Sequence, residues 1–267
     1  MPVLPKKESC VKAKNKVLIP TPRYGFDPTE VSIPWKLLTD NDNDIEVVFA
    51  TPDGEKSQAD KLMVTGERLG IWKSALRARK DAVEAYQALQ TDTAFSSPIK
   101  YEDIDYRDYD GIILPGGHDK AIREYLESDI LQKVVVDFFT DNKPVGAICH
   151  GVVLAARSID PKTNRSVLYD YKTTCLLKSQ ERLAYNMTRL WLKDYYLTYP
   201  ETTVEDEVKS VLKDSKNFQK GSSPLGRDDL QHLNKGFTVK DRNYISARWP
   251  GDVYSFSTEF LEMLRKT

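Results

Sequence analysis

The residue types best suited to chemistry in this sequence stand where short apolar runs end. Cys149 follows the run 143–148 (KPVGAI), which predicts a buried strand, and the small apolar residues 151–157 predict the start of a helix. Amides at a helix N-terminus favour thiolate over thiol. Cys149 is therefore the first candidate nucleophile, in an arrangement like the strand-turn-helix elbow known with serine. A buried structural cysteine is the alternative.

Two of the three histidines lie in loops that follow predicted strands. His118 ends the run 114–118 (LPGGH), His150 directly follows Cys149, and His232 lies elsewhere. Paired glycines permit close backbone approach and can direct amides at an oxyanion, although they also suit a plain tight turn. The ring of His150 is a candidate partner for the thiol, and its amide is a candidate oxyanion donor. A structural or solvated histidine is the alternative.

Glu30 is the candidate acid. It lies in the segment 25–34 (GFDPTEVSIP), just beyond a first apolar strand and at the start of a predicted helix. A carboxyl buried beside a thiol would have a raised pKa and could hydrogen-bond the sulfur or act as a base. An ordinary charge on a helix surface is the alternative.

The elements that must position these residues alternate between strand and helix. Apolar runs predict strands over 16–20, 45–50, 110–115 and 143–148, and helices over 29–38 and 131–140. Such alternation predicts a mainly parallel sheet with helices on both faces. In open sheets of this kind ligands bind beyond the carboxyl ends of the strands. The loops carrying Cys149 and His118 are therefore expected to converge.

The whole chain, residues 1–267, is predicted to be one α/β domain with helical insertions at about 51–109 and 170–229. Within the second insertion we predict a strand over 171–177 and helices over 180–193 and 205–212. Aromatic residues crowd its middle, and they suit core or interface packing or, alternatively, a substrate-facing wall. These residues are Trp191, Tyr195, Tyr196 and Tyr199. Late strands over 237–241 and 244–247 precede a terminal helix that Asp252 is expected to cap.

Composition limits the partners. The 39 basic and 40 acidic residues nearly cancel, no basic block occurs, and no run approaches the roughly 20 apolar residues of a membrane span. We therefore predict neither nucleic-acid nor membrane binding. The N-terminus lacks the apolar core of a signal peptide, which predicts a cytoplasmic protein. The cysteines are Cys10, Cys149 and Cys175, and this odd, scattered set favours free thiols over disulfides or a zinc site.

Glu30, the loop 115–118 and the run 147–151 (AICHG) together resemble the PfpI superfamily, whose fold is like that of class I glutamine amidotransferases. The Gly-Gly-His-Asp119 loop, the Cys-His pair and the chain length are most similar to the branch of heat-inducible chaperones and glutathione-independent glyoxalases. The resemblance covers roughly 14–160 and the C-terminal strand and helix. It implies a three-layer, flavodoxin-like sandwich with a mainly parallel central sheet.

The resemblance also implies roles for the site residues. Cys149 would be the nucleophile, Glu30 would contact its sulfur, and His150 would be its catalytic partner, while the amides of Gly117 and His150 would form the oxyanion hole. Relatives often complete a triad with a carboxylate after the elbow, for which Glu181 and Asp170 are the candidates here. The usual proline after the Cys-His-Gly turn is Val152 in this chain, and the segment 170–229 departs from the glyoxalase branch.

The function that this resemblance implies is conversion of methylglyoxal to lactate without glutathione, through a hemithioacetal on Cys149. Such chemistry uses a small carbonyl or acyl substrate and requires no metal or other cofactor. A cysteine hydrolase of amides or peptides, a holdase chaperone and a thiol redox sensor are the alternatives, and an ordered triad would favour the hydrolase. By analogy with the family we expect a homodimer.

Overall fold

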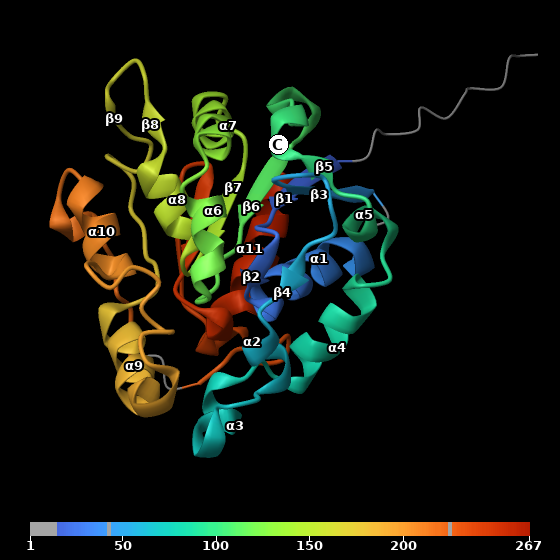
Figure 1. Ribbon diagram of the computed structural model, residues 1–267. Helices are drawn as coiled ribbons and strands as arrows, with labels where there is room; N and C mark the ends of the chain where they lie inside the picture. The colour runs from blue at the N-terminus through green and yellow to red at the C-terminus, as the bar shows by residue number, and fades with distance from the viewer. Residues whose placement is uncertain (1–14, 42–43, 224–225) are drawn as a thin grey trace, which may run out of the picture.

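The computed structural model describes residues 15–41, 44–223 and 226–267. Cys10 lies outside these residues. A seven-stranded sheet forms the centre of the molecule (Figure 1). Its strands, in spatial order, are β10 (Thr238–Asp241), β11 (Tyr244–Ala247), β7 (Val145–Ile148), β6 (Gly111–Leu114), β1 (Asn15–Pro20), β3 (Ile45–Thr51) and β5 (Ile99–Lys100).

All neighbouring strands of this sheet run parallel except β10, which is antiparallel to β11. The central strands β6 and β7 are buried along their whole length, which explains why their sequences are continuously apolar rather than alternating. Leu114 lies opposite Ala147 in the register of this pair. The loops that follow the two strands therefore leave the sheet side by side, as predicted.

Helices cover both faces of the sheet, so the predicted three-layer α/β fold is confirmed (Figure 1). One face carries α1 (Pro28–Asn41), α4 (Lys80–Leu89) and α11 (Val253–Leu264), and the other carries α6 (Arg123–Leu126), α7 (Asp129–Thr140) and α8 (Gly151–Arg157). In the part of the chain that the structure describes, no helix is long and apolar enough to cross a membrane.

The stretch 51–109, predicted as an insertion, contributes directly to this layered core. Its strand β5 extends the sheet beside β3, and α4 packs against α1. The remaining elements of the stretch are short, with β4 pairing with the three-residue strand β2. These elements are β4 (Gln58–Ala59), α2 (Lys61–Thr65), α3 (Lys73–Leu76) and α5 (Thr93–Ser96), and the partner of β4 is β2 (Tyr24–Phe26), which precedes the stretch.

The second predicted insertion contains α9 (Lys178–Leu192) and α10 (Val204–Val211), close to the predicted helices. It follows a small antiparallel pair, β8 (Ile159–Asp160) and β9 (Arg165–Ser166). The predicted strand over 171–177 is wrong, because Thr173 forms only an isolated bridge to Phe218. The amide of Thr174 instead donates to the Ser246 hydroxyl at 2.9 Å.

Asp252 stands at the predicted position before α11, but its side chain does not cap that helix. Its carboxylate binds the guanidinium of Arg248 at 2.8 Å and accepts the amide of Phe237 at 3.0 Å. Both charged side chains are fully buried. Asp252 therefore holds the turn after β11 to the start of β10 instead of satisfying helix amides.

Candidate active site

Cys149 occupies a sharp turn between β7 and α8. Its amide donates to the Ala247 carbonyl of β11 at 3.1 Å, and its φ of 56° lies in the left-handed region. The helix then begins at Gly151, where an added Cβ would lie only 2.0 Å from the Leu114 carbonyl oxygen. A glycine at 151 thus permits α8 to start against β6. The strand-turn-helix geometry predicted for Cys149 is present.

Glu30 is placed by the first turn of α1. Asp27 precedes the helix and accepts the amides of Thr29 at 2.7 Å and Glu30 at 3.3 Å, as N-terminal capping residues do. The Glu30 side chain is fully buried, and its Oε2 accepts the Gly116 amide at 2.8 Å. The loop after β6 is therefore joined to α1 through this carboxyl.

Gly116 brings the three parts of the site together. A Cβ built on this residue would lie 2.6 Å from the His150 amide nitrogen, 2.9 Å from Glu30 Oε2 and 3.1 Å from the Cys149 Cβ. Only a residue without a side chain permits so close an approach. The predicted convergence of Glu30, the glycine loop and Cys149 is present in the structure.

The imidazole of His150 lies beside the thiol. Its Nδ1 is 3.5 Å from Cys149 Sγ, while its Nε2 has no hydrogen-bond partner among the described residues. The ring of His118 packs edge-on against it, with ring centroids 5.0 Å apart. Burial lowers the pKa of His150 well below its usual range and that of His118 to about 4. Both rings are therefore neutral at physiological pH.

Electrostatics assign the proton of the Glu30–Cys149 pair. Burial raises the pKa of the Glu30 carboxyl well above its usual range, and the nearby Asp27 charge raises it further. Both effects therefore favour the protonated, neutral form of Glu30. Its Oε2 accepts the Gly116 amide, its Oε1 is buried without a hydrogen-bond partner among the described residues, and the carboxyl interacts with the Cys149 thiol.

The pKa of the Cys149 thiol is also shifted. Burial raises the pKa of Cys149 well above its usual range, negative charge on Glu30 or Asp27 would raise it further, and the His150 amide lowers it. The His150 amide thus favours the thiolate, as expected at this turn, but burial acts in the opposite direction and has the larger effect. Because Glu30 is neutral, its charge does not oppose thiolate formation, and its O–H can donate to the sulfur.

The amides predicted to bind an oxyanion are those of Gly117 and His150. The His150 amide is directed at the Cys149 sulfur, where it favours the thiolate. Gly117 lies where an added Cβ would come within 2.3 Å of the Gly25 carbonyl oxygen. The neighbouring Gly116 amide is occupied by Glu30, which leaves the amides of Gly117 and His150 as the candidate oxyanion donors.

Neither candidate for a third triad member reaches His150. The buried carboxylate of Glu181 accepts the Val204 amide at 3.1 Å, between α9 and α10. Asp170 is exposed and forms an ion pair with Lys213 at 3.3 Å. Across the described part of the chain, His150 Nε2 meets no carboxylate. The arrangement is thus a Cys-His pair with a buried glutamic acid rather than a Cys-His-acid triad.

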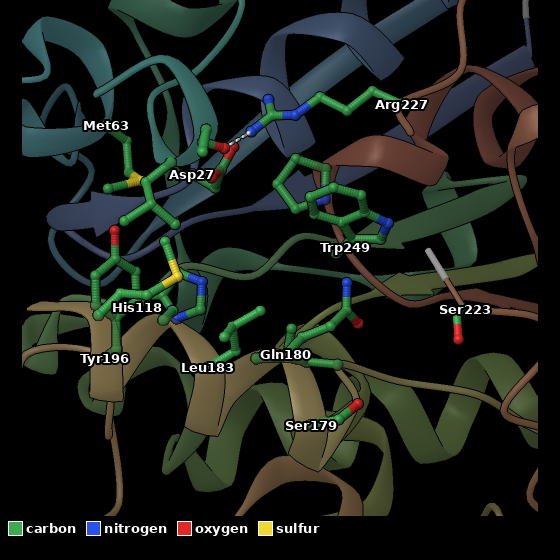
Figure 2. Close-up of a pocket in the computed structure, with 16 residues that line it drawn as sticks. Asp27, Met63, His118, Ser179, Gln180, Leu183, Tyr196, Ser223, Arg227 and Trp249 are labelled. Atoms are coloured by element: carbon green, nitrogen blue, oxygen red, sulfur yellow. Dashed lines mark hydrogen bonds between the residues drawn. The ribbon is translucent and has the colours of Figure 1, made fainter. Parts of the chain in front are cut away.

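A pocket of about 410 Å³ lies beside the buried site, with His118 and Asp27 in its wall (Figure 2). Cys149 itself is 1% exposed. Of the four aromatic residues considered in the sequence, Tyr196 lines this pocket and packs on His118, with ring centroids 5.0 Å apart. Trp191 does not line the pocket; its indole N–H donates to the backbone carbonyl of Arg68 at 2.6 Å.

Sequence reasoning missed the other pocket residues. Met63 and Arg227 come from segments far from the elbow, and neither belongs to a motif. The crowding of aromatic side chains near Tyr196 was the only local signal in the sequence. Contacts between distant segments, rather than local spacing, create this wall.

Known proteins resemble this chain in sequence. A model of proteins described as ThiJ/PfpI family-like matches residues 21–216. An uncharacterised protein of Schizosaccharomyces pombe is 24% identical over 198 residues, which cover 70% of this chain and 72% of that protein. A deglycase of Thermococcus kodakarensis is 22% identical over 169 residues, which cover 62% of this chain and 69% of that enzyme.

Solved structures share the fold. Glyoxalase III of Candida albicans superposes with a TM-score of 0.69 at 19% identity, over 93% of this chain and 97% of that one. The rapid encystment protein of Francisella tularensis gives a TM-score of 0.68 at 17% identity, over 94% and 99% of the two chains. At such low identity these likenesses establish the architecture alone.

Proposed function

Since this chain belongs to the ThiJ/PfpI-like family, we propose that it is a cysteine-dependent enzyme that acts on small reactive carbonyls and converts methylglyoxal to lactate without glutathione. Relatives named as deglycases and a structural neighbour named glyoxalase III support a carbonyl substrate. The observation that carries the proposal is the Glu30 carboxyl, fully buried beside Cys149 in surroundings that favour its protonated form, with the His150 ring next to the thiol.

The first step forms a carbon–sulfur bond. The sulfur of Cys149 attacks the aldehyde carbon, and its proton passes to His150 Nδ1, which lies 3.5 Å from the sulfur. The aldehyde oxygen becomes an alkoxide facing the amides of Gly117 and His150 and then takes the proton from His150. The product is a hemithioacetal on a neutral site.

The second step moves hydrogen between adjacent carbons. A base removes the proton from the former aldehyde carbon, and the neighbouring ketone oxygen is protonated to give an enediol. Protonation of the second carbon and loss of the hydroxyl proton then give a thioester. Glu30 and His150 can exchange these protons, since both groups border Cys149 and both are neutral at the start.

Hydrolysis completes the cycle. Water attacks the thioester carbonyl, the carbon–sulfur bond breaks, and lactate leaves while the thiol is restored. The sum is addition of one water to methylglyoxal, with no oxidant or reductant consumed. Oxidation of the aldehyde carbon is balanced by reduction of the ketone carbon.

Amide hydrolysis is the less supported alternative. Such a reaction needs a histidine that can hold a proton and deliver it to an amine leaving group, a role that a hydrogen-bonded carboxylate supports. His150 Nε2 has no such partner among the residues described. The proton transfers of the proposed reaction start and end on neutral groups instead.

The test is lactate production from methylglyoxal in the absence of glutathione. Cys149→Ala and Glu30→Gln are both expected to lower kcat/KM by at least a hundredfold, since they remove the nucleophile and a proton-transferring group. Cys175→Ala is the matched control, because this second buried cysteine is held against the Leu176 carbonyl. An inactive native protein of verified fold would refute the proposal and favour client protection or thiol oxidation as its role.

A further inference from the structure

The pocket beside the buried site is much larger than methylglyoxal requires. Its volume is about 410 Å³, whereas a methyl group, similar in size to a water molecule, occupies roughly 30 Å³. Pockets of several hundred cubic ångströms hold ligands well beyond a few heavy atoms. The methyl group of methylglyoxal would leave most of this space without contacts.

The lining of the pocket is mainly apolar. Figure 2 shows side chains from three separate parts of the chain facing the same space. The segment 61–76, helix α9 and the turn after β11 each contribute. The apolar lining residues are Met63, Leu76, Leu176, Leu183, Met187 and Trp249.

The charged groups of the wall neutralise one another. The Arg227 guanidinium points towards the Asp27 carboxylate (Figure 2), and the two charges stabilise each other. Arg227 also donates to the Ala75 carbonyl at 3.0 Å and lies over the Trp249 ring. A charged substrate tail would have to compete with this pair. An uncharged tail would not.

His118 links the pocket wall to the nucleophile by a chain of contacts. This ring lines the pocket and packs on His150, whose Nδ1 faces the Cys149 sulfur. The Nδ1 of His118 is buried without a hydrogen-bond partner in the described chain. A ligand that fills the pocket would thus place its polar end, which carries the reacting carbon, against His118. Its apolar part would lie towards α9 and Trp249.

We infer that this pocket selects 2-oxoaldehydes that carry an uncharged apolar chain of several carbons, in preference to methylglyoxal. This inference rests on the proposed function for its chemistry, and on the volume and lining of the pocket for its choice of substrate. The reacting dicarbonyl end would lie by His118 and the chain would contact Leu183, Met187 and Trp249.

The experiment measures kcat/KM for unbranched 2-oxoaldehydes from methylglyoxal to 2-oxooctanal. For the native protein we expect a rise of about threefold or more per methylene until the pocket is filled, because each buried methylene is stabilised by apolar burial. Ala184→Phe and Leu183→Trp place bulk in the pocket and should flatten this rise while turnover of methylglyoxal remains. Leu183 is 60% exposed, so its replacement does not disturb the core.

Leu190→Trp is the matched control. This residue lies on the same helix, is 89% exposed and does not line the pocket, so the variant should show the native rise. A native protein that turns over methylglyoxal with no dependence on chain length would overturn the inference and leave the proposed function standing. The same holds if the rise persists in Leu183→Trp and Ala184→Phe.

A second measurement separates the pocket from the reaction. Binding of 2-octanone, which lacks the aldehyde, is followed by titration calorimetry. Saturable binding that is lost in Leu183→Trp supports the apolar-chain pocket even if no 2-oxoaldehyde is turned over, in which case only the proposed reaction fails. Absence of 2-octanone binding to the folded native protein, together with absence of turnover, would refute both.

Discussion

At the scale of single residues, the site depends on where one proton resides. Burial raises the pKa of Glu30 and of Cys149, but the helix amide of His150 acts only on the sulfur, and Asp27 adds to the shift of the carboxyl. The pair cannot ionise twice in so buried a place. A neutral carboxyl beside a thiol that can ionise is the arrangement in which Glu30 assists the nucleophile.

This assignment predicts the effect of removing the carboxyl. Glu30→Leu should raise the pKa of the Cys149 thiol and slow its alkylation by iodoacetamide at neutral pH by about tenfold or more, because a hydrogen bond to the thiolate is lost. Exposed Glu84 on α4 provides the control Glu84→Leu, which should react at the native rate. A faster reaction in Glu30→Leu would show that Glu30 is ionised in the native protein.

Gly116 gives a second prediction at this scale. Gly116→Ala should lower the free energy of unfolding by about 1–3 kcal/mol and reduce turnover, since the new methyl group would collide with the His150 amide and Glu30 Oε2. Chemical denaturation and kcat/KM check the two effects. Gly226→Ala is the control, because nothing lies within 4 Å of a Cβ at that position. Native stability in Gly116→Ala would contradict the close packing described.

Local sequence predicted the residues of the site better than their state. Cys149, Glu30 and His150 each lie next to a recognisable strand or helix, so spacing alone brings them to one edge of the sheet. Whether a third acid joins them depends on how the segment 170–229 folds back over the sheet. No local pattern specifies that path, and neither Glu181 nor Asp170 contacts His150.

At the scale of elements, Glu181 joins two helices. It lies in the first turn of α9, and its carboxyl accepts the first amide of α10, at Val204. Burial raises the pKa of Glu181 from 4.5 to about 7. The folded state therefore binds a proton that the unfolded state releases between these two values.

The stabilising effect of this proton should disappear as pH rises. The contribution of Glu181 is fully present below about pH 4.5 and is lost as pH rises through about 7, at most about 3 kcal/mol. Glu181→Gln keeps an acceptor for the Val204 amide and carries no charge. Its free energy of unfolding should exceed that of the native protein at pH 8 and match it at about pH 4, whereas Glu201→Gln, at an exposed site, should change neither. Equal free energies of unfolding for Glu181→Gln and the native protein at pH 8 would contradict the raised pKa of Glu181.

Most elements of the core could be predicted because their patterns are local. The apolar runs of β1, β3, β6 and β7 and the periodic helices α7 and α9 appear within about two residues of their predicted bounds. The prediction of a strand over 171–177 is wrong because the apolar side chains of this run are buried although its backbone forms no β-ladder. Its backbone instead forms hydrogen bonds with side-chain hydroxyls and a single β-bridge. An apolar sequence pattern does not distinguish such a buried segment from a strand.

At the scale of the whole molecule, two segments that local patterns suggested as insertions meet across the carboxyl edge of the sheet. Met63 and Leu69 from the first pack with Ala184 and Tyr196 from the second in a separate apolar cluster. The polar thiol site is thereby covered by a wall that neither segment could form alone. The substrate choice that we infer would depend on that joint surface rather than on the elbow.

The family also suggests an assembly, and we expect the protein to be a homodimer. Sedimentation equilibrium should then give a mass about twice the 30.5 kDa of the chain. The measurement should be made over a range of concentrations, because a weak dimer dissociates on dilution. A mass of one chain at every concentration would exclude the dimer and show that the site is complete within a single copy.

The left-handed backbone of Cys149 has a consequence for how this position changes over evolution. Every residue with a Cβ is disfavoured at a φ of 56°, whereas glycine is not. Backbone strain of about 1–2 kcal/mol therefore opposes a cysteine at this turn, and glycine would relieve that strain only by giving up the buried side chain. A strained, fully buried thiol of this kind is expected to persist where its chemistry is used.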